Sequence, residues 1–495
     1  MHAGARAGVT GMHDMRLDTR HLCLALLACG WLAQAHAQQV SPAAGAATTS
    51  AQHSGYVDLL GGLAYTDNAL LTSRNQASDG IATVGFNVDY KRRGNLSLNL
   101  LGNLDRIQYI KSSFGGSFYG NFFGSGLLGR PSSILQWQLS DSLGEEMTDP
   151  LAAPTPQSLQ IINDAATGPL INLHFGLTNR LTLFGLYSRT TYQRSPFDSQ
   201  TYQGGAALTH SLPGESSLSL NASIAHTQYI DSAAVRQFFT GSSASYDIRQ
   251  ASLSYKARFV RTRLLLTAGY NTIQFGGGSM HGAPLYEVRL SRRISPFSTV
   301  FVGGQQIYTT NGGSLSSPGA QVALQVGASL NPGYAVAQPF NERSADAGWM
   351  FNRARTSLSL TGTYGQQIFN QTSIAGRNDN YRYYGASAVL GRQLRPTLRV
   401  QLQAQGYWSR YSQLHANTRR ETIRLTVSKR FARTMIWVYI ERWQQSGSPG
   451  VSSFLASSFT DDRVGLYVTY DLFGERPMQP SLQGMPGMGG TMGGY

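Results

Sequence analysis

The sequence predicts an all-β protein: a transmembrane, antiparallel, up-and-down β-barrel of about twenty strands, within a range of about 16 to 22. Three observations predict it. Strands with strict apolar–polar alternation recur from about residue 55 to residue 473. Glycine (55), tyrosine (25) and phenylalanine (21) are abundant, while charged residues make up only 13%. Short turns also alternate with longer polar loops, as they do in outer-membrane barrels.

The N-terminal residues read as a secretory signal. Arg16 and Arg20 give the basic region, 22–32 the short apolar region, and Ala-His-Ala at 35–37 a cleavage site. Both cysteines of the chain, Cys23 and Cys29, lie inside this signal. We therefore expect a signal peptide at 1–37, a loose periplasmic N-terminal segment at 38–54 and the barrel at 55–473. Residues 474–495 are rich in Gly, Met and Pro and are expected to be a disordered tail.

Turn-forming residues divide the barrel region into strand pairs. A closed barrel has short periplasmic turns and longer external loops, and an even strand number returns the C-terminus to the periplasm. Gly, Pro and Asn supply the backbone conformations that short turns need. Short turns are predicted at 93–95, 129–132, 178–180, 213–215, 295–297 and 395–397. Longer loops are predicted near 67–79, 147–164, 231–245, 310–339 and 446–460.

Polar side chains occupy one face of each strand, and in a barrel that face must line the lumen. In 397–411 the even positions from Leu398 to Ala404 are apolar, and the odd positions from Arg399 to Tyr407 are polar or aromatic. Rings of basic side chains favour anions, and aromatic faces beside Arg and Gln suit a sugar polymer. The predicted pore-lining residues are Lys256, Arg258, Arg289, Arg293, Arg399, Arg424, Arg430, Tyr407, Trp437, Tyr439 and Trp443.

The last strand, 463–473, alternates over its whole length and ends in an aromatic residue. Its order of residues resembles the assembly signal on the final strand of bacterial outer-membrane barrels. The residues that carry the resemblance are Gly465, Val468, Tyr470 and Phe473. It implies the barrel assembly machinery as a partner.

Residue sets for chemistry were sought and not found. The six histidines after the signal do not pair at metal-ligand spacing, so no metal site and no cofactor are expected. His174 shares its face with Asn172 and is the best catalytic candidate, but an ordinary lumen histidine is favoured, and we expect no enzyme. The net charge of +14 and the export signal, without a nucleic-acid motif, argue against nucleic acid. Acidic polymer, outer-membrane lipid and lipopolysaccharide are the expected counterparts.

The layout resembles the beta-barrel porin 2 group of outer-membrane proteins, which includes exopolysaccharide-secretion barrels of proteobacteria. The resemblance rests on Gly61–Asn68, with its Tyr-Thr-Asp-Asn exit, and on Thr460–Tyr467, a polar lead-in to a Gly-and-aromatic closing strand. It implies a channel in the outer membrane of a Gram-negative bacterium that exports an extracellular polysaccharide with a periplasmic export partner.

Two other functions stay open. A general or anion-selective diffusion porin would carry a constriction loop folded inward, and residues 310–339 are long enough to form one. A surface adhesin or structural barrel would have a plugged lumen and binding loops.

Overall fold

The computed structural model describes residues 52–238, 245–276, 278, 280–310, 313, 338–370, 380–412, 414–448 and 457–473. All of them belong to one compact unit, residues 51–495. The predicted signal peptide, most of the predicted segment 38–54 and the predicted tail lie outside the described residues. The first strand begins at Gln52, slightly before the predicted barrel start at residue 55.

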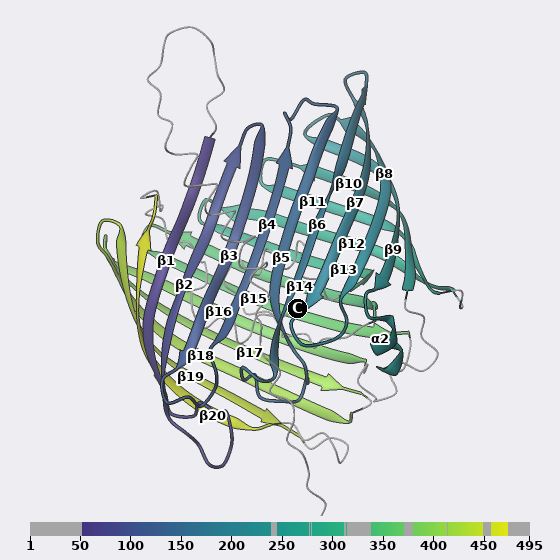
Figure 1. The fold of residues 1–495 in the computed structure, drawn as a ribbon. Coiled ribbons are helices and arrows are strands. Elements are labelled where there is room, and N and C mark those ends of the chain that lie inside the picture. The colour runs from purple at the N-terminus through teal and green to yellow at the C-terminus, as the bar shows by residue number, and fades with distance from the viewer. Residues whose placement is uncertain are drawn as a thin grey trace, which may run out of the picture. The chain divides into compact units, whose positions relative to one another are not determined.

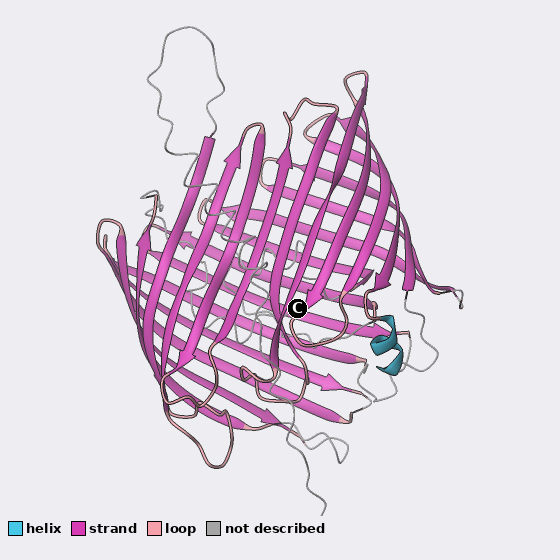
Figure 2. Cartoon of the chain, in the orientation of Figure 1, coloured by secondary structure: helices cyan, strands magenta, loops and turns pink. Residues whose placement is uncertain are grey.

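The described chain is almost entirely β-strand, with one short helix (Figures 1 and 2). The helix is α2, Ser232–Phe238. The strands are β1 Gln52–Thr66, β2 Asp79–Arg93, β3 Leu96–Tyr109, β4 Ser117–Leu128, β5 Leu135–Met147, β6 Leu159–Phe175, β7 Asn179–Tyr192, β8 Ser199–Leu212, β9 Ser216–Tyr229, β10 Ser245–Arg258, β11 Thr262–Phe275, β12 Met280–Ser295, β13 Ser298–Thr309, β14 Phe340–Arg353, β15 Thr356–Phe369, β16 Tyr381–Arg395, β17 Leu398–Tyr411, β18 Ala416–Arg430, β19 Thr434–Gly447 and β20 Phe459–Asp471.

Each strand pairs antiparallel with the next along the chain, and β20 pairs back onto β1. The described residues thus form one 20-stranded closed sheet, which confirms the predicted fold class. Figure 1 shows β1–β8 on the near wall and β15–β20 on the far wall. Among the described residues, no helix has the length and apolar character needed to span a bilayer.

Turns and loops segregate to the two ends of the barrel. The end that holds the start of β1 and the end of β20 carries short connections, such as 94–95, 213–215 and 396–397. The opposite end carries the longer ones, including 67–78 and 230–244. This confirms the predicted asymmetry and makes the short-turn end periplasmic. One predicted turn is displaced: it lies at 176–178, because Asn179 and Arg180 already belong to β7.

Alternation along the strands separates an outer and an inner face. On β20, Val464, Leu466 and Val468 are about half exposed on the outside, whereas Arg463 and Tyr467 are buried on the inside. The same pattern places Leu, Ile and Val on the outer face of the other strands. Apolar side chains that no protein atom covers must meet lipid, so this face is the membrane-facing one.

The β1–β20 seam closes the barrel with unusually tight packing. Gly62 on β1 lies under the ring of Tyr467, and a Cβ there would stand 2.1 Å from a ring atom. Gly465 on β20 lies under Tyr439 in the same way, at 2.4 Å. Tyr439 and Tyr467 stack on each other at 5.7 Å. Glycine is required at both positions because any side chain would displace the stacked rings.

Hydrogen bonds latch the loop end of this seam. Thr66 Oγ1 donates to Asp461 Oδ1 at 2.5 Å, and Asp462 N donates to Asp67 Oδ1 at 2.8 Å. Asn68 Nδ2 donates to the carbonyl oxygen of Thr460 at 2.8 Å. The Tyr-Thr-Asp-Asn exit of β1 therefore fastens β1 to the polar lead-in of β20.

We expect Gly62→Val to prevent efficient closure, because overpacking against Tyr467 costs about 1–3 kcal/mol or more. The neighbouring Gly61→Val is the matched control, since nothing lies within 4 Å of its Cβ position. Heat-modifiable migration on gels measures the folded fraction. Equal folding of the two variants would contradict the assigned packing of the seam.

Candidate functional site

The candidate site is the inner wall of the barrel. Every predicted pore-lining residue lies on this wall. On β19, Trp437, Tyr439 and Trp443 are buried, whereas Val438 and Ile440 between them are exposed outside. The other predicted residues share the inward parity of their strands. They are Tyr407 and Arg399 on β17, Arg424 and Arg430 on β18, Arg289 and Arg293 on β12, and Lys256 and Arg258 on β10, where Ala257 between the two cations is nevertheless buried.

The aromatic residues do not face open water, which corrects the expectation that a passing polymer would meet them. Trp443 is 1% exposed, packs edge-on against Phe459 at 5.0 Å and lies under the guanidinium of Arg463 at 5.0 Å. Trp437 and Tyr439 are 4% and 5% exposed. These side chains are covered by other protein atoms, so their present role is packing.

Three of the predicted arginines pair with carboxylates, Arg258 at the rim and Arg289 and Arg424 deeper in the wall, which weakens the simple picture of a basic lumen. Arg424 pairs with Glu441, its cross-strand partner, and also lies 5.1 Å from the Tyr439 ring centroid. Arg289 Nε donates to Glu287 Oε1 at 2.7 Å. Glu287 lies two residues before Arg289 on the same face of β12, so alternation places the two together. Glu441 meets Arg424 across the β18–β19 ladder, and alternation alone does not reveal that contact.

The predicted cations other than Arg289 and Arg424 gather at the short-turn mouth. Lys256 and Arg258 end β10, Arg293 lies near the end of β12, and Arg430 ends β18. Arg399 lies at the start of β17, directly after the turn 396–397. Arg258 faces Arg263 across the β10–β11 ladder and lies 3.4 Å from Glu215. Positive charge therefore gathers at the periplasmic rim of the inner wall.

The predicted assembly residues fall on both faces of β20. Val468 and Tyr470 face outward and are 40% and 45% exposed, whereas Gly465 faces inward under Tyr439. The Phe473 ring lies 6.1 Å from that of Tyr90 on β2. Phe473, just after β20, thus contacts β2, beyond the strand β1 that pairs with β20. Recognition of this last strand by the assembly machinery stays a prediction.

The loop 148–158, which we call the inward loop, leaves the wall. The β4–β5 ladder stops at Phe122↔Leu143, although β5 stays paired with β6 up to Met147↔Leu159. Across the resulting gap, Gly120 N donates to the buried carboxylate of Glu145 at 2.5 Å. The tip of the β5–β6 hairpin is therefore free to bend into the barrel.

The inward loop docks on the opposite wall. Arg420 of β18 donates to Met147 Sδ at 3.1 Å and to the carbonyl oxygen of Pro150 at 3.4 Å. Gln445 of β19 accepts from Arg420 Nε at 2.6 Å and donates to Ala152 O at 3.5 Å. Because β5 and β18 lie on different sides of the closed sheet, these bonds span the lumen.

A second anchor holds the other side of the inward loop. Arg194, in the β7–β8 connection, donates to the carbonyl oxygens of Pro156 and Gln157. Gln160 accepts from the backbone N–H groups of Arg194 and Ser195, at 3.2 and 3.0 Å. The inward loop is thus a fixed part of the loop end, held from two walls.

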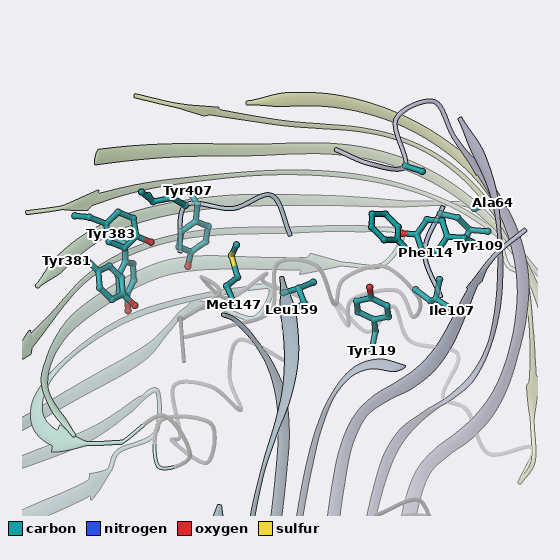
Figure 3. Close-up of a cluster of buried hydrophobic side chains, with 14 of the residues drawn as sticks. Ala64, Ile107, Tyr109, Phe114, Tyr119, Met147, Leu159, Tyr381, Tyr383 and Tyr407 are labelled. Atoms are coloured by element: carbon teal, nitrogen blue, oxygen red, sulfur yellow. The ribbon is translucent and has the colours of Figure 1, made fainter. Parts of the chain in front are cut away.

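Apolar side chains pack around the base of the inward loop and fill the lumen there. Met147 and Leu159, at the base of the inward loop, lie between the tyrosines of the far wall and the first strands (Figure 3). Tyr381, Tyr383 and Tyr407 form one side of the cluster. The other side includes Ile107, Tyr109, Phe114 and Tyr119. The loop end of this half is closed by packed side chains.

The position of the inward loop was missed by the sequence analysis. Under the porin alternative, residues 310–339 are long enough to form a constriction loop, and of these only 310, 313, 338 and 339 are described. The loop predicted at 147–164 is shorter than expected, since β6 begins at Leu159. Arg420 and Arg424 both lie at even positions of β18 and therefore on the same face. Starting the predicted strand a few residues before Glu421 would have placed Arg420 on the inner wall as well.

The wall of β7–β13 carries a second buried apolar cluster, with Tyr229, Tyr246, Ile273 and Tyr308, and also a cavity. A cavity of about 330 Å³ lies along β8–β13 and is lined by Ser, Asn, Gln and small residues. Hydroxyl and amide side chains bond across the strands: Thr209 to Ser219 at 2.9 Å, and Asn221 to Ser254 at 3.2 Å. This side of the lumen thus combines a packed apolar cluster with a cavity whose lining is mostly polar and uncharged.

Metal and catalytic groupings were examined over the same residues. No group of three His, Cys, Asp or Glu side chains that could hold a metal occurs in the described ranges. Asn172 accepts a hydrogen bond from Thr182 at 3.0 Å, and His174 faces Arg180 across the β6–β7 ladder.

Comparisons with known proteins reach only the fold. No family model matches the chain, and no curated protein matches it. Solved structures with a similar fold include the siderophore receptor PirA from Acinetobacter baumannii (10% identity, TM-score 0.44, covering 86% of this chain and 81% of that chain). OccK2 from Pseudomonas aeruginosa has 12% identity and a TM-score of 0.38 over 85% of this chain and 98% of that one. The copper transporter OprC has 12% identity and a TM-score of 0.39, covering 85% and 80%. The closed sheet, its apolar outer face and its polar inner wall are those of a membrane-spanning β-barrel, the fold of outer-membrane proteins.

Charge reversal at the periplasmic rim tests the cation ring. We expect Lys256→Glu with Arg293→Glu to shift the ion preference toward cations, because selectivity follows the charges that line a pore. Reversal potentials in planar bilayers under a KCl gradient measure the shift. Arg292→Glu is the matched control, as Arg292 neighbours Arg293 on the outer face. An equal shift in the control would place the ring outside the conducting path.

Proposed function

We propose that the protein is an outer-membrane channel that exports an extracellular polysaccharide past the inward loop. The observation that carries the proposal is the row of hydroxyl and amide side chains on the inner face of β8–β11, which includes Thr209, Ser219, Asn221, Ser254 and Thr267. Barrels of about 16–18 strands already leave an aqueous channel, so a 20-stranded barrel has room for a polymer even where a loop occupies part of it.

A polymer needs a wall on which it can exchange hydrogen bonds without being trapped. The hydroxyl groups of Thr209, Ser219, Ser254 and Thr267 follow one another across neighbouring strands. Because these groups are neutral, each bond to a sugar hydroxyl contributes only about 0.5–1.5 kcal/mol. Such bonds orient a polymer chain and still allow it to move.

A diffusion porin is the second candidate, and the inward loop favours it. A loop held across the lumen by Arg420 and Gln445 narrows the path in the way that a constriction loop does. The packed cluster around Met147 also fits a partly plugged barrel. The two transport functions differ in what crosses, so secretion and uptake must be measured side by side.

Contacts with lipid and partners are part of the proposal. Arg382 and Arg410 are direct cross-strand neighbours, and both are exposed on the outer face near the loop end. Like charges placed opposite each other destabilise a sheet unless an anion lies near them, and the phosphates of lipopolysaccharide supply such anions. The cationic rim at the other end would receive a periplasmic export partner.

Deleting the gene tests the direction and the cargo. We expect extracellular polysaccharide to fall and polymer to accumulate in the periplasm, while the uptake of small anions is unchanged. Sugar analysis of the culture medium and of periplasmic fractions measures this, with a plasmid-borne copy as the control. Normal secretion with lost anion uptake would replace export with the porin function.

Releasing the inward loop tests the constriction. Arg420→Ala with Gln445→Ala removes the bonds to Met147, Pro150 and Ala152. We expect the single-channel conductance to rise about twofold or more, since the pore is widened where lining groups constrict it. Arg419→Ala is the matched control because Arg419 points outward and pairs with Glu421. Unchanged conductance in the double variant would mean that the inward loop does not limit the path.

A further inference from the structure

The cavity on β8–β13 is hollow because its wall is built from small residues. Ala207, Ser223, Ser252 and Ser254 bring little side-chain volume to the lining. The resulting volume of about 330 Å³ lies at the lower end of the range for small-molecule sites. This hollow lies on the β7–β13 side of the lumen, where a transported molecule would pass.

An aromatic ring forms one wall of the cavity. Phe184 of β7 is the cross-strand partner of Gly205, and a Cβ on Gly205 would stand 2.5 Å from the Phe184 ring. One face of the ring therefore rests on the β8 backbone, while Phe184 also lines the cavity. The faces of aromatic rings carry negative partial charge, which attracts the weakly positive C–H groups of a sugar ring.

Three glutamines supply hydrogen-bonding groups around the cavity. Gln203, Gln250 and Gln305 come from β8, β10 and β13 and all line it. Within the described residues, no hydrogen bond engages their side-chain amides, and all three are partly exposed. Each amide offers two donors and an acceptor, the set that pairs of neighbouring sugar hydroxyls require.

Charge in the cavity excludes an acidic occupant. Among its lining residues only Glu287 is charged, and its carboxylate already accepts a bond from Arg289 at 2.7 Å. No lining lysine or arginine is present to pair with a carboxylate or phosphate. A uronic acid or phosphorylated sugar would therefore meet a carboxylate and lose its own hydration without compensation.

We propose that this cavity is a binding subsite for one neutral sugar unit of the transported polysaccharide. The ring of Phe184 packs against one face of the sugar ring, and Gln203, Gln250 and Gln305 bind the hydroxyl groups of the sugar. The proposal rests on the proposed export function and narrows its substrate: the polymer carries neutral sugars at the units that this wall contacts. It replaces the acidic polymer expected from the overall charge.

Calorimetric titration of the full-length, detergent-solubilised protein tests the subsite without requiring an open channel. The probes are maltohexaose, which is neutral, and hexagalacturonate, which is acidic and of the same length. We expect maltohexaose to bind at least about tenfold more tightly. Gln203→Ala with Gln250→Ala and Gln305→Ala should weaken binding of the neutral probe by about tenfold or more, since each lost bond costs a factor of roughly two to ten.

Two further variants separate binding from folding. Phe184→Leu keeps an apolar residue and should weaken maltohexaose binding, whereas Phe184→Tyr keeps the ring and should preserve it. Gln403→Ala removes an amide from the inner face of β17, outside the cavity, and should leave binding unchanged. Heat-modifiable migration confirms that each variant is folded before the titration.

The outcomes distinguish the subsite from the export function. Tighter binding of hexagalacturonate, no binding of either probe, or full binding by Phe184→Leu would each overturn the subsite. None of these results would bear on conduction or secretion, which test the channel separately. Two results together would support the subsite and contradict export: binding of maltohexaose to the purified protein depends on Phe184, and deletion of the gene leaves polysaccharide secretion unchanged.

Discussion

The structure depends on closing one sheet in a medium that offers no hydrogen-bonding partner. Every backbone group in the hydrocarbon region must be paired within the protein, so the two edge strands have no alternative to each other. The β1–β20 ladder meets this requirement from Asp58↔Asp471 to Thr66↔Arg463. Gly62 and Gly465 permit the close approach of stacked tyrosines, and Thr66, Asp67 and Asn68 fasten the loop end. If this seam fails, the edges of the sheet are exposed and the remaining strands lose their support.

Closure of the sheet then determines which kinds of side chain the outer and the inner face can carry. The outer face is apolar because it meets lipid, and the inner face is free to vary around the barrel. On β16–β20 and β1–β3 the inner face carries Tyr, Trp and ion pairs that are buried under one another. On β8–β13 it carries Ser, Thr, Asn and Gln beside small residues, and a cavity remains. The barrel is therefore asymmetric inside, although its strands are regular.

The inward loop produces this asymmetry. Leaving the β4–β5 ladder unpaired above Phe122 exposes backbone groups, and Glu145 compensates one of them by accepting from Gly120. Arg420, Gln445 and Arg194 then hold the loop from two walls, so it is positioned as firmly as a strand. A transported molecule is left with the β7–β13 side, where Glu287, paired with Arg289, is the one charged residue of the cavity lining. The other charged groups lie elsewhere, at the periplasmic rim and in buried pairs, which is why overall charge is a poor guide to the cargo.

Local alternation in the sequence determined the fold class, the approximate strand number, the placement of turns and the face of each pore-lining residue. These properties follow from period-two geometry and turn chemistry, which act between neighbours in the chain. The tertiary structure decided which residues meet across the lumen. It pairs Arg424 with Glu441, covers Trp443 with Phe459, and brings the loop after Met147 to Arg420. The register of neighbouring strands sets the first two contacts, and the closure of the whole sheet sets the third, which joins residues far apart in the sequence. The cavity beside Phe184 has the same origin: its lining comes from seven strands, and no single strand contains a signal for it.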